Sequence, residues 1–386
     1  MTSVKDKVVF MFETWNKQKI SKLSQIDIEQ WFDVLNNGLE EDRNYHLSDP
    51  NIEEIKANIK NDYIEYLKSC KNNKSFHAYY ILREDYGTIV SVCRIVIIDD
   101  LYYLEGLETH RDYYQRGYST KLLNKVLYAL KRDRIECIYS IVRNHNHKSL
   151  NFHYKFGFNE IDKNDTDTKF SLNVDDQIKK ELFNVWASNY NNSVVKSEQE
   201  DTYPFAGYSR IKYQIIDIVT KKSSAHILDM GVGTGEITSP LYNLGYRITG
   251  VDLSEKMIDL AKKKMPNAIF ICNTFKDSLA KLNDQYDFIV FNYSIHHLDY
   301  QIQIDLLLKK YDKLSKQGKI IIGDVSTLNT QDMNNLKEKY DSIWDDEEYY
   351  PILDIYQKSE LRNFYKISYT KINEVAGLFV LLKKDF

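Results

Sequence analysis

A glycine-rich stretch in the second half of the chain, Asp229-Met230-Gly231-Val232-Gly233-Thr234-Gly235, decides the fold. It follows an apolar run at 225–228 that has the pattern of a strand and precedes a helical pattern, and Asp252 closes the next apolar run, 17 residues after Gly235. This order is typical of a nucleoside-binding βαβ unit, because glycine lets the backbone approach a ligand closely and an acidic side chain accepts hydrogen bonds from both ribose hydroxyls. The alternative is a structural turn followed by a surface aspartate.

Apolar runs and helical patterns alternate along the rest of this half. Strands are predicted at 225–228, 246–251, 268–271, 288–291 and 319–322, with helices between them. Such alternation indicates a parallel, doubly wound, Rossmann-like sheet. A last apolar run at 376–382 is predicted as an edge strand, and its direction, parallel or antiparallel, stays open.

The spacing of the glycines favours S-adenosylmethionine (SAM) over NAD as the ligand. A NAD site uses G-x-G-x-x-G, whereas this loop has the form D-x-G-x-G-x-G. The carboxylate of Asp229 would repel a pyrophosphate, whereas SAM carries an ammonium and a sulfonium that suit a nearby acidic residue. The sequence therefore predicts a SAM site.

Four segments together carry a family resemblance: 182–190, 203–208, the glycine loop and Ile295-His296-His297-Leu298. With these segments, residues 176–386 resemble the class I SAM-dependent methyltransferases of small molecules. They are more closely similar to a branch that is linked to methionine-to-cysteine recycling. The resemblance implies an enzyme that methylates a small molecule.

The resemblance also assigns residues to the cofactor. Gly231, Gly233 and Gly235 should line the methionine moiety, with Asp229 beside them. The other implied cofactor residues are Tyr190 near the amino-acid end of SAM, Asp252 on the ribose, Met257 near the adenine, and Asn292 near the transferred methyl group. Thr274 stands where the family usually has an aspartate for the adenine amino group, so that contact is either weaker here or supplied by Asp277.

The adjacent histidines are candidates for catalysis. The resemblance places His296 or His297 toward the transferred methyl group, where one imidazole could act as a base or hydrogen-bond donor for the acceptor. The alternative is that both only cap and pack. We expect no metal, because adjacent side chains of a regular helix or strand do not face one site.

The first half of the chain contains a second motif, at 104–123. It has the pattern of a strand, a polar turn and an amphipathic helix, and backbone N–H groups at such a turn and helix start form an anion cradle for a pyrophosphate. The implied cradle residues are Gln115, Arg116, Gly117, Tyr118, Ser119 and Thr120. A structural turn alone is the alternative reading of this segment.

A further segment, 146–158, follows a predicted strand at 137–142, and with the first motif it resembles the GNAT superfamily of acyl-CoA N-acyltransferases over about residues 18–172. The resemblance implies binding of acetyl-CoA or another acyl-CoA, with Asn146 added to the cradle residues. His153 stands where the family has a tyrosine that protonates the departing thiolate, and Tyr114 stands where the family has Gln or Arg.

A general base is also needed, to take a proton from the acceptor amine. Glu105 is the first candidate and Glu108 the second, and Gly106 between them predicts a β-bulge where the strand separates from its neighbour. The alternative is that both glutamates are solvated on a strand edge.

Two domains are predicted, a mixed-sheet GNAT-like α+β domain at 1–172 and a Rossmann-like methyltransferase domain at 173–386, separated by a hairpin turn near 162–169 and a new helix from 175. With 52 basic and 56 acidic residues the formal net charge is −4, which disfavours a nucleic-acid partner. The four scattered cysteines fit neither a disulfide framework nor a thiolate zinc site.

Charged residues interrupt each apolar run before it could span a bilayer, so we expect a cytoplasmic protein with small-molecule substrates and no membrane partner. A homodimer stays open. We expect a bifunctional enzyme, an N-acetyltransferase and a methyltransferase on one chain. The alternatives are a methyltransferase whose first domain only senses acyl-CoA, and modification of a protein amine.

Overall fold

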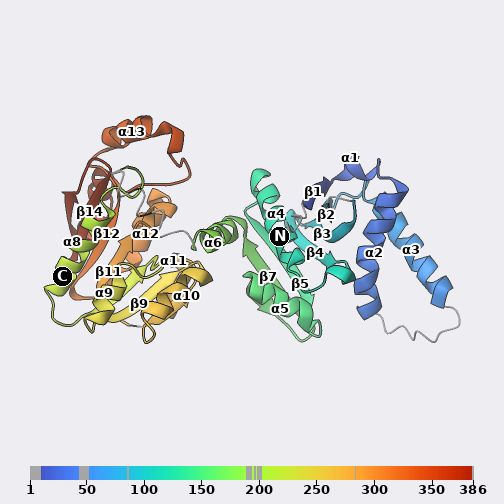
Figure 1. Ribbon diagram of the computed structural model, residues 1–386, viewed down its shortest axis with the longest axis horizontal. Coiled ribbons are helices and arrows are strands. Elements are labelled where there is room, and N and C mark those ends of the chain that lie inside the picture. Colours follow the sequence, from blue (N-terminus) through green and yellow to red (C-terminus); the bar gives the residue numbers. More distant parts are fainter. Residues whose placement is uncertain are drawn as a thin grey trace, which may run out of the picture. The chain divides into compact units, whose positions relative to one another are not determined.

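The structure is a computed structural model that describes residues 10–42, 52–84, 87–187, 194, 197, 202–282 and 284–384 (Figure 1). The chain divides into two compact units, 1–179 and 180–386. The division falls inside helix α6 (Val174–Trp186), seven residues after the predicted boundary at 172. Each unit is described by itself below.

The first unit is built on a mixed seven-stranded sheet with the strand order β1-β2-β3-β4-β5-β7-β6. Its elements are β1 (Phe10–Trp15), α1 (Lys17–Ile20), α2 (Gln25–Asp42), α3 (Ile52–Ser69), β2 (Phe76–Glu84), β3 (Ile89–Ile98), β4 (Leu101–Thr109), η1 (Arg111–Tyr113), α4 (Tyr118–Arg132), β5 (Cys137–Arg143), α5 (His147–Phe156), β6 (Asn159–Lys163) and β7 (Asp167–Asn173). The predicted hairpin near 162–169 is confirmed as β6 and β7, and the predicted mixed sheet is confirmed.

Strands β4 and β5 separate after a short parallel contact. They pair only at Tyr102 with Ile138 and at Tyr103 with Tyr139. On its other side β4 carries the expected bulge, because Arg94 pairs with Gly106 and the next residue of β3 pairs with Leu104, which leaves Glu105 as the extra residue. Beyond the bulge, β4 diverges from β5 toward the turn that precedes α4.

Two clusters of buried side chains cover the two faces of this sheet. Helix α4 inserts one face of its amphipathic pattern into the first cluster, through the fully buried Leu122, Leu123 and Val126. Helices α2 and α3 contribute to the second, where Trp31 and Phe32 are buried and Tyr63 and Tyr66 pack at its margin. These four aromatic residues therefore belong to the core on this face of the sheet.

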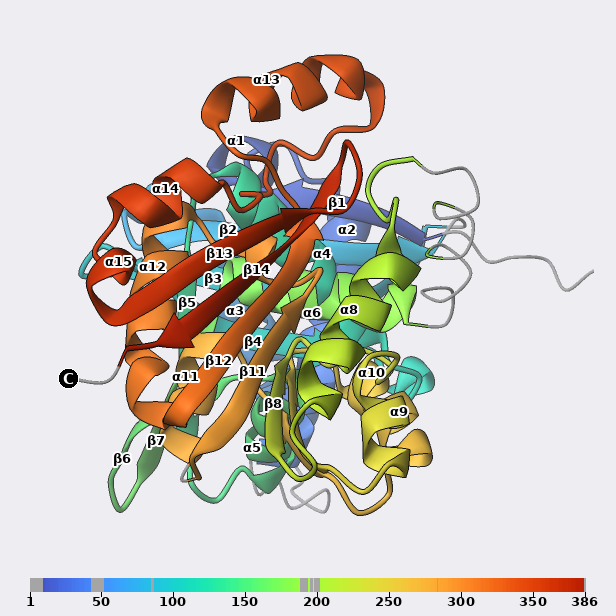
Figure 2. The same ribbon diagram turned by 90° about the vertical axis from the view of Figure 1, so that its left-hand side faces the viewer.

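The second unit holds another seven-stranded sheet, with the order β10-β9-β8-β11-β12-β14-β13 (Figure 2). Its elements are α8 (Tyr208–Thr220), β8 (His226–Met230), α9 (Thr238–Asn243), β9 (Arg247–Asp252), α10 (Glu255–Lys264), β10 (Ile269–Cys272), α11 (Phe275–Ser278), η2 (Leu279–Lys281), β11 (Tyr286–Asn292), η3 (Ile295–His297), α12 (Tyr300–Lys309), η4 (Tyr311–Lys313), β12 (Leu314–Val325), α13 (Thr330–Lys339), η5 (Asp341–Ile343), α14 (Leu353–Lys358), α15 (Leu361–Phe364), β13 (Tyr365–Lys371) and β14 (Ala376–Lys383).

The five strands from β10 to β12 are parallel, as predicted, and β8 lies between β9 and β11. Alternate residues of each strand enter different cores. Ile227 and Val290 pack in one cluster with α8, whereas Leu228 and Ile289 pack in the other with α12. Strand order reverses between β8 and β11, and open sheets of this kind bind ligands in the crevice beyond the carboxyl ends of such strands.

The prediction of 376–382 as an edge strand is wrong. Strand β14 is antiparallel and pairs with β12 on one side and with β13 on the other, so that β13 forms the edge. The sequence of β13, Tyr-Lys-Ile-Ser-Tyr-Thr-Lys, alternates polar and apolar residues and leaves mostly polar side chains outside. A uniformly apolar strand such as β14 is buried on both faces, which is a property of an interior position.

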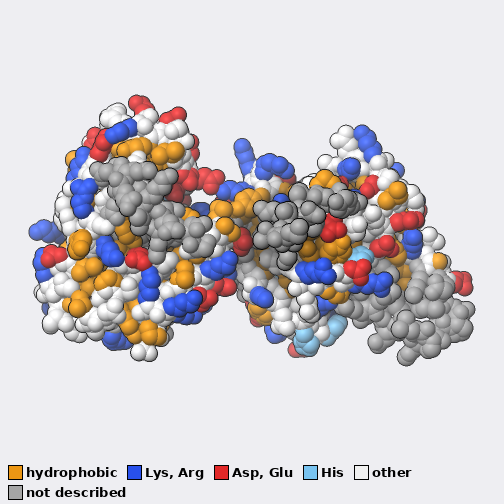
Figure 3. Space-filling view, in the orientation of Figure 1, with side chains coloured by type: hydrophobic (Ala, Val, Ile, Leu, Met, Phe, Trp, Pro, Cys, Tyr) orange, Lys and Arg blue, Asp and Glu red, His pale blue; other side chains and the backbone are white. Residues whose placement is uncertain are grey.

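Across the described residues, no helix has the length and apolar character needed to cross a bilayer. On the face that Figure 3 shows, acidic and basic side chains are interspersed over both units. This agrees with the near balance of 52 basic and 56 acidic residues.

Candidate functional site

The glycine loop leaves β8 in a backbone conformation that only glycine adopts easily. Gly231 and Gly233 have φ values of 88° and 53°. A Cβ at Gly231 would lie 2.4 Å from Cβ of Ser294, so the loop is packed directly against the segment after β11. A Cβ at Gly233 would meet no atom of the described chain within 4 Å, so this part of the loop faces open space.

A pocket with about 260 Å³ of empty space lies at this loop. Its lining residues come from α8, the loop and the end of β11: Tyr208, Asp229, Gly231, Val232, Gly233, Thr234, Glu236, Ile237 and Asn292. Three of the predicted cofactor residues on the loop, and Asn292 from a different strand, thus line one cavity. The structure brings these four residues together, and their contact with a cofactor stays a prediction.

Two oxygens in this pocket lack partners. Oδ1 of Asp229 and Oδ1 of Asn292 are both buried, and neither has a hydrogen-bond partner among the residues that the structure describes. A buried polar atom left without a partner costs about 1–3 kcal/mol. Two such acceptors lining one pocket indicate a ligand with a donor or a positive charge.

The carboxylates of Asp229 and Asp252 are both perturbed. Burial raises the pKa of Asp229 to about 7, against a hydrogen bond that its Oδ2 accepts from the Thr238 hydroxyl at 2.9 Å, and the charge of Asp252 adds to the rise. Burial also raises the pKa of Asp252 to about 6. Perturbed carboxyl groups in a cleft are a common mark of a functional site.

Asp252 ends β9 and holds the glycine loop. Its Oδ2 accepts the backbone N–H of Gly233 at 2.8 Å, and its Oδ1 accepts the N–H of Ser254 at 2.9 Å. Because an ionised carboxylate has about four acceptor positions, both oxygens keep capacity for ribose hydroxyls. The same side chain can therefore fix the loop and receive a ligand.

Three further residues of this unit were predicted to contact the cofactor: Met257, Thr274 and Tyr190. Met257 is buried on the first turn of α10. Thr274 caps α11, where its hydroxyl accepts the N–H of Asp277 at 3.1 Å and donates to the carboxylate of Asp277 at 3.0 Å. The two side chains considered for the adenine contact are thus bonded to each other. Tyr190 lies outside the described residues.

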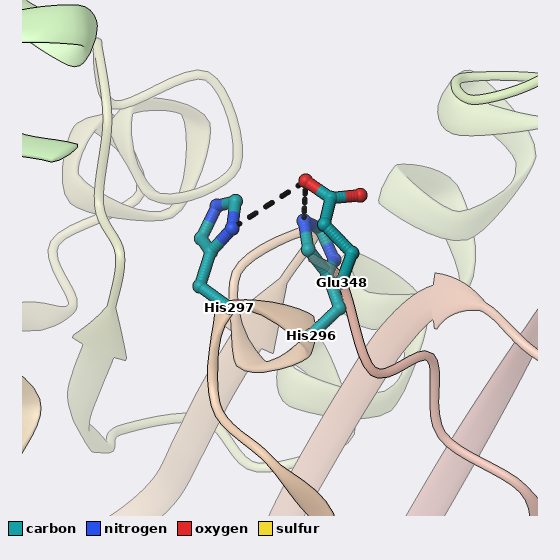
Figure 4. Close-up of side chains that lie close together, drawn as sticks. All are labelled: His296, His297 and Glu348. Atoms are coloured by element: carbon teal, nitrogen blue, oxygen red, sulfur yellow. Dashed lines mark ion pairs between the residues drawn. The ribbon is translucent and has the colours of Figure 1, made fainter. Parts of the chain in front are cut away.

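The expectation that His296 and His297 cannot face one site is wrong. They lie on the 3₁₀ turn η3, which is neither a regular helix nor a strand, and their ring centroids are 4.2 Å apart. Nε2 of His296 and Nδ1 of His297 each lie 3.5 Å from Oε1 of Glu348 (Figure 4). A 3₁₀ turn closes after three residues, so neighbouring side chains diverge less than on a strand.

His296 also contacts a buried carboxylate. Its Nδ1 lies 2.7 and 2.9 Å from the two oxygens of Asp324, which is fully buried at the end of β12. Burial lowers the pKa of His296, but the charges of Asp324 and Glu348 outweigh it and raise the pKa to about 9. Sequence reasoning missed Asp324 and Glu348. Asp324 could have been found, since it ends a strand beside the one that leads to the histidines.

In the first unit, the predicted anion cradle forms a turn at the start of α4. Gln115 and Gly117 have φ values of 59° and 78°, and Gly117 occupies the N-cap position of α4. Oγ of Ser119 lies 2.7 Å from Oγ1 of Thr109, which connects the first turn of the helix to the end of β4. This turn and helix start follow the diverging end of β4, which is the arrangement that the resemblance implies.

Other cradle residues have local partners. The guanidinium of Arg116 lies over the ring of Tyr113 at 5.7 Å, and the ring of Tyr118 packs against Phe10 and Tyr113. Thr120 is exposed on the first turn of α4.

Asn146 caps α5, where its Oδ1 accepts the N–H of Ser149 at 3.0 Å. The contacts of Arg116, Tyr118 and Asn146 all lie within the first unit. Binding of a cofactor by these side chains stays a prediction.

His153 is embedded in the core of the first unit. Its Nδ1 lies 2.7 Å from the carbonyl oxygen of Ser149, to which it can only donate, so its Nε2 accepts from the hydroxyl of Ser140 at 2.9 Å. The ring stacks on Phe170 at 5.1 Å, and burial lowers its pKa. A neutral imidazole with both nitrogens engaged does not fit the predicted proton donor.

Glu105 is held in an ion pair. Its Oε2 lies 3.0 Å from Nε of Arg94, a residue on the neighbouring strand that sequence reasoning did not single out. Glu108 lies on the same strand, and its carbonyl oxygen accepts from Ser91 at 2.6 Å. The bulge was predicted correctly, whereas the guanidinium beside Glu105 was not.

Two family profiles match the chain. The acetyltransferase (GNAT) family matches residues 40–158, and the methyltransferase domain family matches residues 227–318. The chain is also similar to an uncharacterised methyltransferase of Alkaliphilus oremlandii (strain OhILAs), with 29% identity over 207 residues that cover 53% of this chain and 89% of the relative. An uncharacterised methyltransferase of Bacillus licheniformis is 34% identical over 145 residues, or 37% of this chain and 65% of the relative.

Among solved structures, the chain is similar to magnesium protoporphyrin IX methyltransferase from Synechocystis PCC 6803 with bound SAH. The TM-score is 0.44 at 16% identity, over 54% of this chain and 99% of that chain. The two family matches, each in its own structural unit, define the protein as a transferase. The chain contains an N-terminal GNAT acetyltransferase domain and a C-terminal methyltransferase domain.

Proposed function

We propose that the second unit transfers a methyl group from SAM to a small molecule, and that the first unit transfers an acyl group from acetyl-CoA or another acyl-CoA. The observation that carries the first half is the pair of buried, unpartnered oxygens on Asp229 and Asn292 at a glycine-lined pocket. SAM presents an ammonium, which satisfies both acceptors and neutralises Asp229. NAD presents a pyrophosphate, which Asp229 would repel.

The residues that would hold SAM are those of the pocket and its rim. Asp229 and Asn292 would receive the ammonium, and the open backbone at Gly233 would admit the methionine chain. Asp252 would accept the ribose hydroxyls while it keeps the loop in place through the N–H of Gly233. When bound, SAM supplies a methyl group made electrophilic by its sulfonium.

For acyl transfer, the support is the diverging end of β4 beside the start of α4. The strand pairs with β5 only at Tyr102 and Tyr103, so its later backbone groups are available to a pantetheine chain. Gln115 and Gly117 have left-handed backbones just before the N-terminus of a 15-residue helix, and a turn of this kind at a helix start suits a pyrophosphate.

The methyltransferase half is tested by calorimetry with SAM and with its demethylated product, S-adenosylhomocysteine (SAH). We expect one site per chain with a micromolar Kd. A metabolite screen with methyl-labelled SAM and labelled acetyl-CoA together would then identify the acceptors. Absence of SAM and SAH binding to the folded protein would refute the proposal.

A second candidate function keeps the methyltransferase and makes the first unit a non-catalytic acyl-CoA sensor. The observation that favours it is the engagement of both predicted proton-transfer groups, with His153 buried and bonded and Glu105 paired with Arg94. Acetyl-CoA hydrolysis or transfer to a panel of amines would eliminate it. CoA binding without any turnover would support it.

A further inference from the structure

Three side chains with metal-binding atoms converge beside the end of β11. His296, His297 and Glu348 each offer one ligand atom, and these atoms all lie within 4.8 Å of one another. Figure 4 shows that the ion pairs of both imidazoles end on the same carboxylate oxygen of Glu348. The two histidines come from η3, and Glu348 comes from the segment that precedes α14.

The orientation of His296 is fixed from behind. A carboxylate can only accept, so in the neutral ring Nδ1–H donates to Asp324 at 2.7 Å, and the lone pair remains on Nε2, the atom that faces Glu348. Histidines that bind metal almost always donate their other N–H to a carboxylate or a carbonyl, which sets the tautomer and the direction of the ring. Asp324 is fully buried, and its carboxylate also accepts the backbone N–H of Val325.

Glu348 is fixed in the same way. Its Oε2 accepts from the hydroxyl of the buried Tyr350, which leaves Oε1 as the atom that faces both imidazoles. The segment is joined to the histidine turn by the N–H of Tyr349, which donates to the carbonyl of His296 at 2.8 Å. Gln303 adds a second connection, because its amide donates to the carbonyls of Leu298 and Tyr349.

Two of the three distances between the ligand atoms fit a tetrahedral ion. With metal–ligand bonds of about 2.0 Å, two ligand atoms of a tetrahedral site lie about 3.3 Å apart. Both distances to Oε1 of Glu348 are 3.5 Å. Two imidazole nitrogens and one carboxylate oxygen form a ligand set that zinc uses in sites with an open fourth position.

One side of the cluster is open to solvent. The side chain of His296 is 8% exposed, whereas those of His297 and Glu348 are 25% and 20% exposed. A structural zinc site is closed by four protein ligands, so three ligands with a solvent-facing side fit the other kind of site. The turn that carries the histidines begins three residues after Asn292, which lines the glycine-loop pocket.

We propose that His296, His297 and Glu348 bind a single divalent zinc ion, with Asp324 as the positioning residue for His296. The fourth position would take a sulfur, nitrogen or oxygen atom of the methyl acceptor, and this last part rests on the proposed methyl transfer. The acceptor class is then a small molecule with a metal-binding donor atom.

Zinc binding by the full-length protein without an affinity tag tests the site. After treatment with a chelator, titration calorimetry with zinc chloride should show one site per chain, and cobalt(II) should give the intense visible absorption of a tetrahedral ion. Glu348→Gln and His297→Ala should each weaken zinc binding by about 100-fold, and Asp324→Asn by about 10- to 100-fold. Glu347→Gln, at the exposed neighbouring position, is the matched control and should change the Kd by less than about 2-fold.

Two further measurements distinguish a loss of zinc binding from a loss of folding and from a failure of the proposed function. Each variant is checked by circular dichroism and by its affinity for SAH, which the metal ligands do not contact in this proposal. Zinc binding that is absent in the wild type, or equal in the wild type and Glu348→Gln, overturns the metal site even if SAH binds. Zinc binding without SAH binding would leave the metal site standing and refute the proposed methyltransferase cofactor.

Discussion

The glycine-loop pocket of the second unit and the diverging strands of the first differ in how their polar side chains are matched. In the pocket, Asp229 and Asn292 each keep a buried oxygen without a partner among the described residues. In the first unit, His153 has both ring nitrogens bonded and Glu105 is paired with Arg94. Two unmatched buried oxygens on residues that line one pocket are available to a ligand, whereas the matched groups of His153 and Glu105 are explained by the fold itself.

The largest expected effect comes from Asp252, the residue proposed to bind the ribose. Asp252→Ala should weaken SAH binding by about 100-fold or more, because it removes hydrogen bonds to a charged acceptor and releases the N–H of Gly233 from it. Asp259→Ala, on the exposed face of α10, is the control and should bind like the wild type. Titration calorimetry measures the SAH affinity of both variants. An unchanged SAH affinity in Asp252→Ala would contradict the role of this carboxylate in ligand binding.

A somewhat smaller effect is expected from Asp229. Asp229→Asn should weaken SAH binding by about 10- to 100-fold, because it removes the charge that would face the ammonium. In the wild type, affinity should fall as the pH drops below about 7, since the pKa of Asp229 is raised to about 7 by burial and its carboxyl group becomes neutral. The Kd for SAH is measured from pH 8 to pH 6 for both proteins. Its dependence on pH should be much weaker in Asp229→Asn than in the wild type.

The same substitution should stabilise the protein without ligand. The pKa of Asp229 in the folded state lies above its ordinary 3.8, so its contribution to stability is present below that pH and is lost as the pH rises through about 7. Asp229→Asn should therefore raise the Tm by about 5 °C at pH 8 and by much less at pH 4. Thermal unfolding at both pH values measures this, and a lower Tm at pH 8 would contradict it.

For the first unit, His153→Ala should act on stability and not on ligand binding. We expect a loss of about 2–3 kcal/mol in the free energy of unfolding, from a cavity against Phe170 and an unpaired Ser140. Affinity for CoA should change by less than about 3-fold. Tyr154→Phe, on an exposed side chain, should cost less than about 0.5 kcal/mol. A normal Tm with abolished acyl transfer would instead make His153 a proton donor.

The smallest effect is expected from Glu105→Gln. Its side chain is 44% exposed, and ion pairs at that exposure contribute about 1 kcal/mol or less, so the free energy of unfolding should hardly change. Denaturant unfolding measures this. If the fall in acyl-transfer rate at low pH disappears in Glu105→Gln, Glu105 is a general base. The polar groups of both regions would then act on ligands.

Much of this protein could be predicted from local sequence. The parallel strands, the glycine loop, Asp252 at the end of its strand and the bulge at Glu105 all follow from patterns within about 20 residues. Strand β14 was assigned to the edge because the alternating pattern of its partner β13 was not recognised as a further strand. The contacts of Glu105 and His153 were missed because Arg94 and Ser140 come from other strands.

The sequence by itself determined the two fold types and predicted the ligand of the glycine loop, because periodicity and glycine spacing act through neighbours along the chain. Only the tertiary structure decided which polar groups are satisfied, since that depends on partners far apart in sequence. It brought Glu348 to His296 and His297 across about 50 residues, placed Asp324 behind the ring, and left a buried oxygen without a described partner on Asp229 and on Asn292, which line the same pocket.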